Sequence, residues 1–144
     1  MIDNLEPAWA GPADGQTVAA RFVGWLETGA RPDKVFAAGV FGDVTLPRWR
    51  LQAGTARDLT AIRAGGHPHP GTVRVERLDP TPRGWVMQVE ERWTDEDGAP
   101  WYCREMFRAD VSDGLISDIA IYCCGDWDAT TVRRHAAEVN LLRP

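Results

Sequence analysis

The chain has 144 residues, of which 44% are hydrophobic, so it is long enough for one domain with a substantial core. Its formal net charge of −5, with arginines scattered rather than clustered, argues against nucleic-acid binding. No apolar run approaches the roughly 18 residues of a membrane span, and the acidic, proline-containing N-terminus does not resemble a signal peptide. We therefore expect a cytoplasmic protein that contacts neither nucleic acid nor membrane.

The first part of the chain predicts a lead-in followed by two helices. Residues 1–15 are rich in Pro, Gly and Ala and are expected to be flexible. Apolar residues at helical spacing predict a helix over Thr17–Thr28, which Gly29 is placed to end. Pro32 suits a helical first turn, so a short second helix is expected at Asp33–Ala38.

A bent strand and a third helix come next. Phe41–Leu51 is extended in character but contains Pro47, which predicts an edge strand or a bent pair of strands. Thr55–Ala64 predicts a helix with Thr55 as its N-cap.

The second half predicts an antiparallel meander of four strands with short connections. These strands are Gly71–Leu78, Gly84–Thr94, Ala99–Val111 and Leu115–Cys124. Two of the joints, Glu96-Asp97-Gly98 and Ser112-Asp113-Gly114, have the acidic-glycine composition of hairpin turns, because glycine adopts a positive φ easily. Asp128–Leu142 predicts a final helix with Asp128 as its N-cap. It could cover a pocket or pack on a second subunit.

The chain therefore divides without a linker into three parts. Residues 1–15 are the lead-in, 16–127 form a pocket domain, and 128–144 form a C-terminal helix packed on that domain.

The register of the meander decides which side chains share a face. Three-residue loops at both turns place Glu91 opposite Cys103, Phe107 beside Ile119, and Glu105 beside Ile121. The resulting face is apolar, and Glu91 and Glu105 lie among its apolar side chains. The apolar side chains are Trp85, Met87, Val89, Trp93, Trp101, Phe107, Ile119 and Ile121. A slip of one residue at either turn would exchange the two faces.

This organisation resembles the nuclear transport factor two-like (NTF2-like) superfamily, and within it the SnoaL-like proteins named for polyketide cyclases. The resemblance rests on Phe41–Pro47 (FGDVTLP), Gly54, Asp113–Ile116 (DGLI) and Ile119–Tyr122 (IAIY), and covers roughly residues 16 to 125. It implies an α+β fold in which a cone-shaped, curved antiparallel sheet wraps around N-terminal helices. It also implies a homodimer and supports the fold better than any one activity.

The epoxide hydrolases of this superfamily use an Arg-x-Asp pair on one strand and an Asp on the last strand. Here Thr94 follows Arg92 at the Asp position, and Ile121 or its neighbours stand where the second Asp is expected. Arg108 and Asp110 have the spacing but lie at a strand end. Epoxide hydrolysis therefore stays an alternative.

Glu91 and Glu105 are the candidate catalytic pair. A carboxyl group on an apolar face has its charged form disfavoured, which raises its pKa toward the range of a general acid or base. The alternative is that one or both form ion pairs with Arg50, Arg92 or Arg104.

Asp43 and Tyr122 are candidate polar groups that position the substrate. The expected apolar walls of the binding site are Trp25, Phe41, Trp49, Trp101, Phe107, Ile119 and Ile121.

The loop histidines and the cysteines are expected to be structural. His67 and His69 flank Pro68 in a loop with no nearby Cys or carboxylate, so no metal centre is expected. The odd cysteine count argues against a disulfide framework, and a nucleophilic cysteine would need a closer basic residue than His135.

The sequence thus predicts a cofactor-independent enzyme of secondary metabolism. It would cyclise, isomerise or dehydrate a small apolar, polyketide- or terpenoid-like substrate by acid/base catalysis. The alternatives are a non-catalytic binding protein of the same fold and an epoxide hydrolase.

Overall fold

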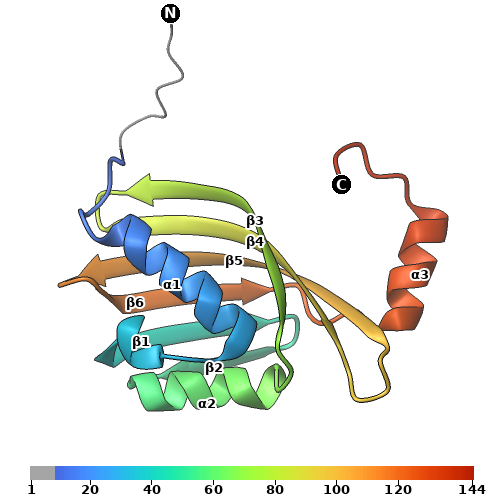
Figure 1. Cartoon of the computed structure of the whole chain (residues 1–144), viewed down its shortest axis with the longest axis horizontal. Helices are drawn as coiled ribbons and strands as arrows, with labels where there is room; N and C mark the ends of the chain where they lie inside the picture. Colours follow the sequence, from blue (N-terminus) through green and yellow to red (C-terminus); the bar gives the residue numbers. More distant parts are fainter. Residues whose placement is uncertain (1–8) are drawn as a thin grey trace, which may run out of the picture.

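The computed structural model describes residues 9–144, so residues 1–8 of the expected lead-in lie outside the described residues, and its last residue, Gly15, already belongs to α1. A single six-stranded sheet curves around two helices, α1 (Gly15–Thr28) and α2 (Ala56–Gly66), while α3 (Ala129–Glu138) stands beside the far end of the sheet (Figure 1). This arrangement confirms the predicted α+β fold with a curved sheet, N-terminal helices and a C-terminal helix.

The end of α1 and the start of α2 are as their sequences predict, while α1 begins two residues before the expected Thr17 and α2 ends two residues after the expected Ala64. Gly29 ends α1 in the left-handed conformation, at a φ of 73°, and its N–H donates to the Trp25 carbonyl. Thr55 caps α2, since its hydroxyl accepts a hydrogen bond from the Asp58 N–H.

The predicted short helix at Asp33–Ala38 is wrong beyond its first turn. Only Pro32–Lys34 forms a single 3-10 turn, and strand β1 already begins at Phe36. The reason is tertiary: Phe36 and Val40 are fully buried, and Phe36 pairs with Ile116 of the sheet.

The sheet has the spatial order β2-β1-β6-β5-β4-β3. Its strands are β1 (Phe36–Leu46), β2 (Trp49–Ala53), β3 (Gly71–Thr81), β4 (Gly84–Thr94), β5 (Pro100–Ser112) and β6 (Leu115–Cys123). The segment around Pro47 is a bent pair, as predicted, with β2 at the edge of the sheet. The four-stranded meander is also confirmed. One pair was not predicted: β1 lies parallel to β6, which makes the sheet mixed.

The first hairpin has the predicted register. Asp95 N–H donates to the Ala99 carbonyl across the turn, and Glu91 lies opposite Cys103.

The second hairpin differs from its predicted register by two residues. The turn contains only Asp113 and Gly114, both at positive φ, and a bulge follows between Asp110 and Val111. Phe107 therefore pairs with Ile121, and Glu105 pairs with Cys123. Because two single-residue shifts add to an even number, the same side chains still face inward.

The core lies between the concave face of the sheet and α1. Phe22 of α1 packs edge-on against Phe107 of β5, with ring centroids 4.7 Å apart, and also contacts Trp85 of β4. On the other side, Gly42 of β1 gives Leu59 of α2 room, since an added Cβ would lie 2.7 Å from its Cδ1. This close approach sets α2 against the open end of the curved sheet.

The C-terminal helix contributes no buried residue to the structure. Asp128 caps it as predicted, accepting from the Thr131 N–H, but the helix ends at Glu138. It is attached through the Trp127 ring, which packs at a tilt against Tyr102 of β5 on one side and His135 on the other. None of the described helices is long and apolar enough to cross a membrane.

Candidate functional site

A cavity of about 490 Å³ lies between α2 and the concave face of the sheet. Its walls are mostly aliphatic and come from α1, α2, β1, β2 and β6. They include Leu26, Val44, Leu46, Leu51, Leu59, Ile62 and Ile121. One end is polar and is lined by Arg63, His67, Glu105, Cys123 and Asp126. The cavity is thus suited to a small apolar molecule that carries a polar group at one end.

Arg63 organises the polar end. Its guanidinium binds both oxygens of Glu91, with Nη1–Oε2 and Nη2–Oε1 distances of 2.8 and 2.5 Å. Nη2 also donates to the carbonyl of Leu26, which is in the last turn of α1. A two-pronged bond of this kind fixes the orientation of both partners. Arg63 therefore joins α2, α1 and β4 at one point.

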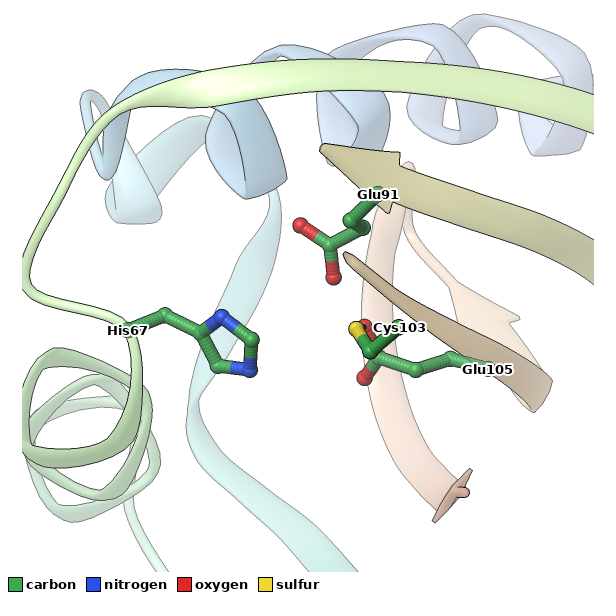
Figure 2. A group of neighbouring side chains, drawn as sticks. All are labelled: His67, Glu91, Cys103 and Glu105. Carbon is green, nitrogen blue, oxygen red and sulfur yellow. Dashed lines mark hydrogen bonds between the residues drawn. The ribbon is translucent and has the colours of Figure 1, made fainter. Parts of the chain in front are cut away.

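Glu105 is the second carboxyl group of the site. It points from β5 into the cavity, near Glu91, Cys103 and His67 (Figure 2). Its Oε1 lies 3.6 Å from Arg63 Nη1 and also accepts a weak hydrogen bond from the Cys103 thiol at 3.6 Å. Its side chain is buried, and Arg63 is already bound to the other carboxylate.

The two glutamates consequently have opposite protonation tendencies. Burial raises the pKa of Glu105 well above its usual range, and the adjacent Glu91 raises it further. Burial also opposes ionisation of Glu91, but hydrogen bonds from Arg63 and Glu105 outweigh it and lower its pKa. The two opposite shifts favour an ionised Glu91 beside a protonated Glu105. Such a division is typical of acid/base pairs.

His67 completes the polar end from the opposite wall. It follows α2, and its ring points across the site toward Cys103 and Glu105 (Figure 2). Its Nε2 lies 3.6 Å from Asp126 Oδ1, and its ring packs edge-on against Trp93. Burial raises the pKa of Asp126.

Two groups of potential metal ligands occur among residues 9–144, each with its ligand atoms within 4.8 Å of one another. The first is His67, Glu91, Cys103 and Glu105, but Arg63 already binds both Glu91 oxygens and its positive charge opposes a cation. The second is Cys103, Cys123 and Asp126, one ligand short of the four in a structural zinc site.

Four of the residues predicted for the site line the cavity: Glu105, Trp25, Phe107 and Ile121. Glu91 lies directly behind them, bound to Arg63 rather than to Arg50, Arg92 or Arg104. Ile119 faces inward but is fully buried in the core beside Ala109.

The remaining predicted residues do not line the cavity. Asp43, Phe41 and Tyr122 lie on the outer face of the sheet, because the inward positions of β1 and β6 are Val44 and Ile121. Asp43 binds Arg50 there, with the shorter contact at 2.6 Å.

The two predicted wall tryptophans are also elsewhere. Trp49 begins the edge strand and is 68% exposed. Trp101 stacks on Trp93 and donates its indole N–H to Asp95.

Sequence reasoning did not identify Arg63 as a site residue and placed His67 in a surface loop. Arg63 sits one position after Ile62, at the inward-facing edge of α2, so its helical phase was a usable signal. His67 carried no such signal, since its position depends on how α2 meets the sheet.

No protein-family model matches the chain, and no curated protein matches it. Solved structures do. An NTF2-like protein of Anabaena variabilis is 12% identical over 85% of this chain and 96% of that chain, with a TM-score of 0.64. A protein assigned to the SnoaL-like polyketide cyclases, from Jannaschia sp. CCS1, is 11% identical over 96% and 100%, with a TM-score of 0.61. An M. tuberculosis LEH-like epoxide hydrolase is 10% identical over 76% and 82%, with a TM-score of 0.56.

Identities this low carry information about the fold and not about the activity. Together with the curved sheet and its two covering helices, they show that the chain has the NTF2-like fold.

Proposed function

We propose that the protein is a cofactor-independent enzyme that transfers a proton on a small, largely apolar organic molecule. The observation that carries this proposal is the pair of buried carboxyl groups at the polar end of an apolar cavity, one bound through both oxygens by Arg63 and the other without such a bond. Isomerisation, cyclisation and dehydration all need a proton moved at a confined carbon or oxygen.

The cavity supports a substrate with a hydrocarbon body. Its volume of about 490 Å³ falls within the usual range of small-molecule sites, and its walls are aliphatic and aromatic. Polyketide- and terpenoid-like compounds have this character. The donors and acceptors at one end suit a single carbonyl or hydroxyl group.

Glu105 is the proposed general acid. Its carboxyl group lines the cavity and burial raises its pKa, so it can donate a proton to a substrate oxygen. The imidazole of His67, on the opposite wall, can accept a proton from the substrate carbon. Glu91 is then a positioning residue, because Arg63 occupies both of its oxygens.

Hydrogen–deuterium exchange tests the proton transfer directly. Apolar cyclic ketones are incubated with the protein in D₂O, and deuterium at the α-carbon is followed by NMR. We expect Glu105→Gln to bind the same ketones and to lower the exchange rate by about 100-fold or more, the usual range for a general acid or base. Glu96→Gln, which alters a well-exposed loop carboxylate, is the matched control.

The alternative functions give different results. A non-catalytic binding protein would bind the ketones without accelerating exchange in the wild type. Unchanged exchange in Glu105→Gln would rule out the proposed acid.

Epoxide hydrolysis is the second candidate. The observation that favours it is the position of Glu105 beside Arg63 in the cavity wall, since this carboxyl group could protonate the opening epoxide oxygen while the His67 imidazole activates a water. Arg92 and Arg108, the arginines considered from the sequence, form ion pairs with Glu90 and Asp110 instead. Diol formation from limonene oxide would distinguish this function from isomerisation.

A further inference from the structure

Cys123 is a thiol in the cavity that the proposed proton transfer does not use. It ends β6, lines the polar end, and lies directly across from Glu105 in the strand register. The other two cysteines differ from it: Cys103 is fully buried and Cys124 is exposed.

Several groups surround the Cys123 sulfur. The backbone N–H of Gly125 donates to its Sγ at 3.4 Å. The Cys103 sulfur lies within 4.8 Å of it, and the His67 ring lines the same end of the cavity. The neighbouring Cys103 thiol is the main cause that lowers the pKa of Cys123, while burial opposes the shift. The neighbouring Cys123 and burial raise the pKa of Cys103. Cys123 is therefore the member of the pair that ionises, and a thiolate is the nucleophilic form.

The basic neighbour that a reactive cysteine requires is thus present, although it is His67 and not His135. His67 comes from the end of α2, across the cavity from β6, and lies 3.6 Å from Asp126. A thiol, an imidazole and a carboxyl group accordingly meet at the open polar end.

We propose that Cys123 is a nucleophilic site that adds to apolar α,β-unsaturated carbonyl compounds entering the cavity. The sulfur lone pair forms a bond to the β-carbon, and the π electrons of the C=C bond move to give the enolate. The thiol proton passes to His67, and one proton then reaches the α-carbon. The net change is addition of S–H across the C=C bond, without an oxidant or reductant.

The register supports this ligand class. Directly paired residues of neighbouring strands have side chains within contact of one another, and Cys123 is paired with Glu105. The carbonyl oxygen and β-carbon of an enone are three bonds apart, so one ligand can reach both groups. The addition itself requires only the thiol, His67 and the cavity, and it stands whether or not Glu105 catalyses proton transfer.

The test is the rate of alkylation by N-ethylmaleimide, an α,β-unsaturated dicarbonyl, in a Cys124→Ser background with a chelator present. Below its pKa a simple thiol reacts about tenfold faster for each pH unit. We expect the rate at Cys123 to change less than threefold from pH 6 to 8, while that of N-acetylcysteine rises about 100-fold. Peptide mass mapping should locate the adduct on Cys123, and Cys123→Ser should abolish it.

A rate that rises in parallel with N-acetylcysteine, or an adduct that persists in Cys123→Ser, would overturn the proposal. His67→Asn should make the pH dependence steeper than in the wild type, if its fold is intact by circular dichroism. If that variant does not fold, the wild-type pH profile alone decides. Glu105→Gln should still be alkylated, which separates this result from the test of proton transfer.

Discussion

Glu91 and Glu105 have the same side chain and lie close together, yet their pKa values shift in opposite directions. Glu91 and Glu105 are both buried glutamates on the concave face, yet only Glu91 receives the two-pronged bond from Arg63. Without that bond, the cost of removing a charge from water dominates at Glu105. Burial therefore favours the neutral form of this carboxyl group, which can donate a hydrogen bond.

The protonated state of Glu105 predicts a pH-dependent effect on stability. Above the unfolded pKa of about 4.3, the unfolded chain loses a proton that the folded chain keeps, because the folded pKa of Glu105 is raised. Wild-type stability therefore falls as pH rises toward the folded pKa. Glu105→Gln removes this loss, so its free energy of unfolding relative to wild type should increase from pH 5 to 8, by at most about 1.4 kcal/mol per pH unit.

Urea unfolding of both proteins at pH 5, 6, 7 and 8 measures this difference. The lowered pKa of Glu91 acts mainly below pH 5, since its contribution is lost as pH falls through the folded value. A difference that stays constant over the whole range would mean that Glu105 is ionised in the folded protein.

Among the elements, α2 is held to the rest of the fold by Arg63 as well as by apolar packing. The side chain contacts β4 through Glu91 and α1 through the Leu26 carbonyl. Removing it leaves Glu91 as an unpaired buried charge, which typically costs about 3–5 kcal/mol. We expect Arg63→Met to lose stability of that size, and Glu91→Gln in the same chain to recover part of it.

Arg50→Met is the matched control for that experiment. Arg50 also binds a carboxylate, Asp43, through two hydrogen bonds, but on the exposed face of the edge hairpin. Exposed ion pairs contribute little, so its loss should change the urea midpoint far less. Equal losses for Arg63→Met and Arg50→Met would contradict the structural role of Arg63.

The elements also show what the sequence can and cannot predict. Helix caps such as Thr55 and Gly29, and the hairpin at Gly98, follow from local rules, and the structure has them. The bulge before Val111 and the parallel pairing of β1 with β6 do not, since both depend on the whole sheet. The inward face was nevertheless predicted correctly. The turn and the bulge each shift the strand pairing by one residue, and a total shift of two leaves the same side chains facing inward.

The residues of the site divide in the same way, into those that local sequence patterns predict and those that only the packing of the whole fold brings together. Glu105 was identified from strand alternation alone, which survives a two-residue shift. Its partners, Arg63 and His67, lie on or after α2, and only the packing of that helix against the sheet brings them near. The sequence analysis wrongly placed Asp43 and Tyr122 in the cavity. Which side chains of β1 and of the end of β6 face inward depends on how these strands pair, and no turn signal fixes that pairing.

At the scale of the whole molecule, the outer face of the sheet has no part in the proposed chemistry and yet exposes apolar side chains. Its centre exposes two apolar side chains, Met106 at 45% and Tyr122 at 59%, which are partners in the register of β5 and β6. Beside them Arg104 binds Glu76 in an exposed ion pair. An apolar centre with charges of both signs around it can be self-complementary across a two-fold axis.

We propose that this face forms a homodimer, which would leave the cavities on the opposite, concave faces open to ligand. Met106→Arg places a like charge against its own copy across the two-fold axis, and should convert the dimer to monomer. Leu142→Arg, at a 94% exposed position in the C-terminal segment, is the control and should leave the mass unchanged. Sedimentation velocity at micromolar concentration measures both. A wild-type protein that is monomeric at about 100 μM, with Met106→Arg indistinguishable from it, would show that this face is solvated, since stable dimers of this kind persist well below that concentration.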